Sequence, residues 1–198
     1  MLICGHEYTL YIDYDRGYFH LLDFYGKLEY MRGRVDRDLV LPCRFLLQNQ
    51  DCIAVGLLVP GLVCAGISAA ATFLHGSQAG RGQDRNIFVQ FVRRYMHADL
   101  QHPLVDPRKP NRPRTYVDWL YEDIRCGLSH GFALEWGHIE NLGPYVGLAA
   151  SGQPQINQNE LLEDFVRGWH SYLGEVSLNP AANLAQDFEK RFHEVFHD

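Results

Sequence analysis

The chain has 198 residues and a formal net charge of −6 at pH 7, from 18 Lys and Arg against 24 Asp and Glu. This length suits one domain with its own core, and the acidic balance excludes a protein that binds nucleic acid through net charge alone. The five cysteines are an odd number without a CxxC pair, which excludes a disulfide scaffold and indicates reduced thiols in a cytoplasmic protein. We expect a single domain with a core over 51–198 and an N-terminal extension of uncertain role over 1–50.

The N-terminal extension carries two weak patterns. Residues 1–15 alternate in polarity and predict either a short strand or an ordered arm. Apolar and aromatic residues from Tyr18 to Arg32 predict a helix that is interrupted near Gly26. Between Asp38 and Leu47, a shorter apolar segment contains Pro42, which lies in a first helical turn or forces a break. None of these segments carries chemistry.

The run from Cys52 to Leu74 has no charged residue and is long enough to span a bilayer. However, it contains Pro60 next to Gly61 and many small residues, which also suit a helix packed closely between others. We therefore predict the central helix of a bundle and expect no membrane insertion. A membrane-spanning segment is the alternative.

The second half of the chain alternates between helical patterns and turns. The Gly-rich turn from His75 to Gln83 is not a P-loop, because it lacks GxxxxGK[ST]. Asp84 is predicted to cap a helix to about Leu100, which is followed by a proline-containing loop. A small β-hairpin of LEWGHIE and PYVGLAA comes next, with PQINQ as its third strand. A helix capped by Asn157 or Asn159 and a last helix from Pro180 to Phe196 complete an all-α fold with a β insertion.

Basic residues are concentrated between Arg81 and Arg114, where eight Lys and Arg face three Asp. Such a surplus can steer a phosphate backbone toward a nearby site. The candidate steering residues are Arg81, Arg85, Arg93 and Arg94. The alternative is that these arginines are ordinary solvated charges.

The most specific chemistry lies from Val117 to Phe132, where apolar residues at helical spacing predict an α-helix that ends at Gly131. His130 falls in the last turn, where the helix dipole favours an imidazolium. Arg125 lies five residues earlier, about 140° around and about 7.5 Å along an ideal α-helix, so the two side chains share no face.

Cleavage of RNA without a metal ion needs a group that moves protons and a fixed cation for the charge on the phosphorane, and His130 and Arg125 can fill these roles. The candidate supporting residues are Glu122, Ser129 and Cys126. The alternative is that Arg125 pairs with Glu122 or Tyr121 on the same helix. We expect no metal site, because the histidines lack an HExxH motif or a carboxylate at ligand spacing.

The segment from Leu120 to Phe132, LYEDIRCGLSHGF, resembles the signature helix of the HEPN superfamily, in which Arg is followed by four to six residues and then His. A helix that ends in Leu74-His75-Gly76, the segment FVQFVRRYM and a closing LLEDF helix extend the resemblance over about Ile53 to Phe196. Cys126 replaces a residue that is often small and polar in active nucleases, and Phe132 stands where toxin-type members carry Tyr. Tyrosine-dependent regulation is therefore not expected.

The resemblance implies a HEPN-like helical bundle and a homodimer in which two motif helices face a shared cleft. It implies metal-independent endoribonuclease activity without a cofactor, with Arg125 and His130 as the catalytic pair. RNA and an antitoxin-like protein are the expected partners. The alternative is a non-catalytic HEPN-like module that binds a protein or a nucleotide.

Overall fold

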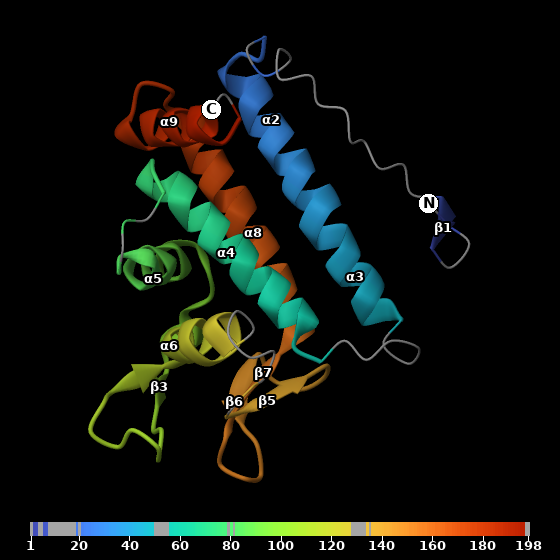
Figure 1. Cartoon of the computed structure of the whole chain (residues 1–198), viewed down its shortest axis with the longest axis vertical. Coiled ribbons are helices and arrows are strands. Elements are labelled where there is room, and N and C mark those ends of the chain that lie inside the picture. Colours follow the sequence, from blue (N-terminus) through green and yellow to red (C-terminus); the bar gives the residue numbers. More distant parts are fainter. Residues whose placement is uncertain are drawn as a thin grey trace.

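The computed structural model describes residues 2–3, 6–7, 19, 21–49, 56–78, 80, 82–127, 134 and 136–196. The described part is mainly helical, with three small β-sheets. Long helices lie side by side along one axis, α9 crosses one end, and β3 and the strands β5 to β7 lie toward the other end (Figure 1). The mainly helical class expected from the sequence is confirmed.

The first long rod is continuous and contains three helical segments: α2 (Phe24–Val35), the π-helix η1 (Asp36–Val40) and α3 (Leu41–Gln48). The side chain of Asp23 caps α2 by accepting a hydrogen bond of 2.7 Å from the backbone N–H of Gly26, so Gly26 lies in the first turn and does not interrupt the helix as predicted. Pro42, which has no N–H to donate, lies in the first turn of α3, one of the two positions that the sequence left open. Leu28 and Cys43 belong to the same core as the rest of the bundle.

The central helix is α4 (Leu58–His75), which contacts α3, α5, α8, α9 and the later π-helix η3. It is the one helix in the described part of the chain that is long and apolar enough to cross a membrane, and half of it is buried within the molecule. The prediction of a central bundle helix is confirmed. α4 ends at Gly76, whose left-handed φ of 69° suits a glycine cap.

Three further helices surround α4: α5 (Asp84–Tyr95), α8 (Gln158–Leu178) and α9 (Asn183–Phe196). Asn157 caps α8, because its side-chain oxygen accepts from the N–H groups of the first turn. α5 differs from the prediction at both ends: Gln83 is its N-cap, and the helix stops at Tyr95 because Met96 adopts an extended conformation. A short 3-10 helix, η2 (Ala98–Gln101), follows.

The described strands form three sheets: β1 (Leu2–Ile3) with β2 (His6–Glu7), β3 (Pro103–Leu104) with β4 (Arg114–Thr115), and β5 (His138–Glu140) with β6 (Val146–Leu148) and β7 (Pro154–Asn157). The third sheet has the order β5–β7–β6, with β7 parallel to β5 and antiparallel to β6. The predicted hairpin between the first two strands is therefore wrong. β7 is the middle strand and the most buried of the three, and it continues directly into α8.

Candidate functional site

The helix that carries the Arg-x4-His motif begins with α6 (Tyr116–Trp119) and continues as the π-helix η3 (Leu120–Arg125). A capping box starts it: Thr115 accepts from the N–H of Asp118, and Asp118 accepts from the N–H of Thr115 at 2.8 Å. The start agrees with the sequence to one residue. The predicted α-helix is replaced by a π-helix from Leu120 to Arg125.

The π geometry changes which side chains share a face. The N–H of Cys126 donates to the carbonyl of Tyr121, five residues earlier, so residues five apart lie closer to one face than in an α-helix. The 140° turn expected for such a pair therefore does not apply within η3. Ser129 and His130 lie outside the described residues. The position of His130 relative to Arg125 therefore stays a prediction.

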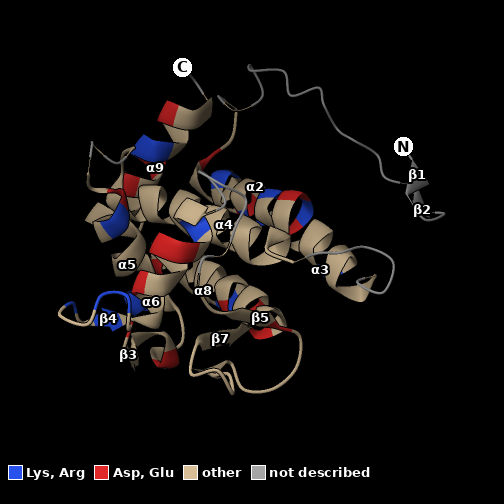
Figure 2. Ribbon diagram, turned by 60° about the horizontal axis from the view of Figure 1, so that its bottom comes forward, with Lys and Arg blue, Asp and Glu red and all other residues tan. Residues whose placement is uncertain are grey.

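One face of η3 is held by a network of ion pairs with the β3–β4 connection. Arg114 is fully buried and pairs with Asp106 and Asp123, while Arg108 donates to both of these carboxylates at 3.0 and 2.8 Å. Basic residues beside β4 lie near acidic residues at and beside α6 (Figure 2). Arg108 and Arg114 are thus engaged in ion pairs within the protein. Hydrogen bonds from Arg108 hold the pKa of the Asp106 carboxyl well below its usual range, although burial acts to raise it.

Glu122 belongs to the same network. Its carboxylate lies 3.5 Å from Lys109, 3.4 Å from Arg114 and 3.6 Å from Arg85, and it also accepts from Arg112. Through these contacts, Glu122 connects η3 to basic residues of the β3–β4 connection and of α5. A role in orienting Arg125 stays a prediction.

Three of the four arginines predicted to steer RNA are described, and each has a protein partner. Arg85 pairs with Asp118, Arg94 pairs with Glu175, and Arg93 donates to Gln101 at 3.2 Å. The carboxylates offset part of the positive charge that the sequence surplus indicates. Arg81 lies outside the described residues, and the steering role stays a prediction.

Arg125 ends η3, and its guanidinium lies 5.1 Å from the ring centroid of Tyr121 and 3.9 Å from Sγ of Cys126. The alternative from the sequence was that Arg125 pairs with Glu122 or Tyr121 on its own helix, and the contact with Tyr121 is present. Burial lowers the pKa of Arg125, but Cys126, Tyr121 and Asp84 outweigh it and raise the pKa. The guanidinium therefore keeps its charge, and it is only partly buried.

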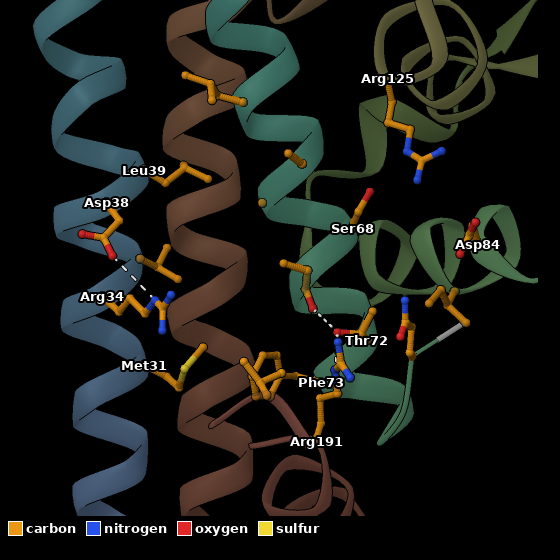
Figure 3. Close-up of a pocket in the computed structure, with 18 of the residues that line it drawn as sticks. Met31, Arg34, Asp38, Leu39, Ser68, Thr72, Phe73, Asp84, Arg125 and Arg191 are labelled. Carbon is orange, nitrogen blue, oxygen red and sulfur yellow. Dashed lines mark hydrogen bonds and ion pairs between the residues drawn. The ribbon is translucent and has the colours of Figure 1, made fainter. Parts of the chain in front are cut away.

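Arg125 also lines a groove of about 580 Å³ that we call the α4 groove. Its floor is the outward face of α4, where Ala65, Ser68, Ala69 and Thr72 recur at helical spacing. Arg34 and Asp38 stand on one side of α4, Arg125 and Asp84 on the other, and Arg191 at one end (Figure 3). Both π-helices border this groove, η1 through Asp38 and η3 through Arg125.

The sequence reasoning missed the residues that complete this groove, Ser68, Thr72, Arg34 and Arg191. Ser68 and Thr72 are hydroxyl residues one turn apart on an otherwise apolar helix, a spacing that could have marked a face with a polar edge. Arg34 and Arg191 come from α2 and α9, which no local pattern brings together. Their presence depends on the tertiary fold.

Among the described residues, no three His, Cys, Asp or Glu side chains lie close enough together to hold a metal ion. A comparison with family models, curated proteins and solved structures finds no match for this chain.

Proposed function

We propose that this chain is a HEPN-type domain that binds RNA in the α4 groove and cleaves it without a metal ion. The observation that carries the proposal is the position of Arg125, because the Arg of the sequence motif lines the α4 groove. A partly exposed guanidinium with a raised pKa suits a phosphate ligand.

In this proposal, Arg125 offsets the charge that develops on the phosphorane when the 2′-hydroxyl attacks the adjacent phosphate. His130 moves a proton at the 2′-hydroxyl or at the leaving oxygen. The proposal extends to a homodimer, in which a second copy contributes its own Arg and His to a shared cleft. Sedimentation of the purified protein measures this assembly directly.

The test is cleavage of single-stranded RNA in EDTA by wild type, His130→Ala and Arg125→Gln. We expect both variants to lose cleavage while their circular dichroism stays that of the wild type. Arg44→Gln is the matched control, because Arg44 pairs with Glu163 on the surface, away from the groove. Equal cleavage by His130→Ala would remove the catalytic assignment, and equal binding by Arg125→Gln would remove the phosphate contact.

A second function, a non-catalytic module that binds a protein partner, is favoured by the apolar groove floor. Leu62, Ala65 and Ala69 offer small or aliphatic side chains that a partner helix could approach closely. In this case Ala69→Glu abolishes binding of the partner while Arg125→Gln retains it. RNA binding predicts the opposite sensitivity to Arg125.

A further inference from the structure

Tyr121 lies four residues before Arg125 on η3 and contacts the end of that helix in two ways. The Arg125 guanidinium lies over its ring, 5.1 Å from the ring centroid. The carbonyl of Tyr121 accepts from the backbone N–H of Cys126. The ring and the backbone of Tyr121 therefore both contact the end of η3, where Arg125 lines the α4 groove.

The ring of Tyr121 is supported by α5. Phe88, which has no exposed surface, packs against it in a T-shaped contact, with 5.3 Å between the ring centroids and 64° between the ring planes. Asp84, the first residue of α5, lies one turn before Phe88 and contributes a negative charge to the surroundings of Tyr121 and Arg125. Asp84 and Arg125 stand on the same side of α4 (Figure 3). One turn of α5 thus supports the ring and places a carboxylate near the cation that the ring holds.

An aromatic ring holds a guanidinium in a different way from a carboxylate. Arg85, Arg94 and Arg114 form ion pairs with carboxylates, which offset their positive charge. The face of a ring attracts a cation through its quadrupole and carries no formal charge. The ring of Tyr121 therefore fixes the direction of Arg125 without offsetting the charge that would bind an anion.

We propose that Tyr121 is a positioning residue, whose ring, supported by Phe88, holds the Arg125 guanidinium in the direction that meets a phosphate in the α4 groove. This inference rests on the proposed function for the identity of the anion. Tyr121 acts through Arg125 and takes part in no chemical step. An Arg side chain loses much rotamer freedom when it binds a ligand, and a ring that already holds it reduces this loss.

The first measurement needs no RNA. NMR relaxation of the Arg125 Nε–H group, whose signal is assigned by its loss in Arg125→Gln, reports how firmly the side chain is held. We expect an ordered group in wild type and in Tyr121→Phe, which keeps the ring, and a mobile group in Tyr121→Leu. Nε of Arg44 donates to Glu163 at 3.0 Å away from the groove, so its signal is the internal control. Equal order of Arg125 in all three proteins would overturn the positioning role.

The second measurement relates the ring to binding. In a His130→Ala background, which by the proposed function does not cleave, fluorescence anisotropy gives the affinity for a labelled single-stranded RNA. We expect Tyr121→Leu to weaken binding about threefold and Tyr121→Phe to bind like the background protein. Because the ring acts through Arg125, Tyr121→Leu should have no further effect when Arg125→Gln is also present. A general loss of structure would weaken binding to the same extent with and without Arg125.

The outcomes separate this inference from the proposed function. If Arg125→Gln weakens binding, and Tyr121→Leu either has no effect or has an equal effect with and without Arg125, the positioning role is wrong and the proposed function remains. If the background protein binds no RNA, the proposed function fails, and the relaxation of Arg125 still decides whether the ring positions the guanidinium. Circular dichroism and thermal unfolding of each variant show whether the fold is retained.

Discussion

Arg114 and Asp123 form an ion pair inside the protein, joining β4 to the π-helix that ends at Arg125. The Arg114 side chain has no exposed surface and that of Asp123 is 7% exposed. Arg114 also forms an ion pair with Asp106, whose side chain is fully buried as well. Removing Arg114 therefore leaves two buried carboxylates with Arg108 as the cation that they share.

Arg114→Met is expected to destabilise the protein by about 3–5 kcal/mol, because the buried carboxylates of Asp106 and Asp123 then share the one guanidinium of Arg108, which lies nearer the surface. Urea unfolding at neutral pH measures the change. Arg44→Met provides the comparison: Arg44 and Glu163 are both 44% exposed, and loss of such a surface pair costs under about 1 kcal/mol. Equal losses in the two variants would show that the buried network contributes no more than a surface pair.

The same network predicts a loss of stability in acid. The pKa of Asp106 is lower in the folded protein than in the unfolded chain, where it is about 3.9. Its contribution is therefore present above that pH and is lost as the pH falls through and below it. The difference in unfolding free energy between wild type and Asp106→Asn should be large at pH 7 and should shrink toward pH 3. A constant difference contradicts the assignment.

The strongly periodic helices were predictable, and the long-range arrangement was not. The uncharged, small-residue run predicted α4, and Asn157 before an amphipathic pattern predicted the start of α8. The order β5–β7–β6 arises from contacts between segments far apart in the sequence, which no local pattern predicts. The π-helix also has no sequence signal.

For the site, the sequence identified Arg125 but not its surroundings. The surplus of basic residues before Thr115 suggested a surface for RNA, whereas Arg108 and Arg114 bind Asp106 and Asp123. A count of charges along the chain cannot distinguish a surface for RNA from internal ion pairs, because Asp123 on η3 comes close to these arginines only after folding. The groove residues Arg34 and Arg191 are likewise far apart in sequence.

Gly66 is expected to be essential to the packing of α4. A Cβ atom at this position would lie 2.7 Å from Leu39 and 2.9 Å from Phe165. Gly66→Ala should therefore destabilise the protein by about 1–3 kcal/mol, despite the better helix propensity of Ala. Thermal unfolding measures the change.

Gly174→Ala is the matched control for this substitution. Gly174 lies in the interior of α8, and a Cβ atom added there would have no heavy atom of another described element within 4 Å. The substitution should stabilise the protein by up to about 1 kcal/mol. A stabilised Gly66→Ala variant would show that α4, η1 and α8 can separate without cost.

Cys126 should be the most reactive of the three described cysteines. Cys43 and Cys64 have no exposed surface, and burial raises their pKa to about 11 and about 12, so both remain protonated thiols near neutral pH. Cys126 is partly exposed beside Arg125. In a Cys4→Ser/Cys52→Ser background, a disulfide reagent should modify one thiol rapidly and the other two only after unfolding. Cys126→Ser should remove the rapid phase, and a rapid phase that persists in this variant would show that Cys43 or Cys64 is the reactive thiol.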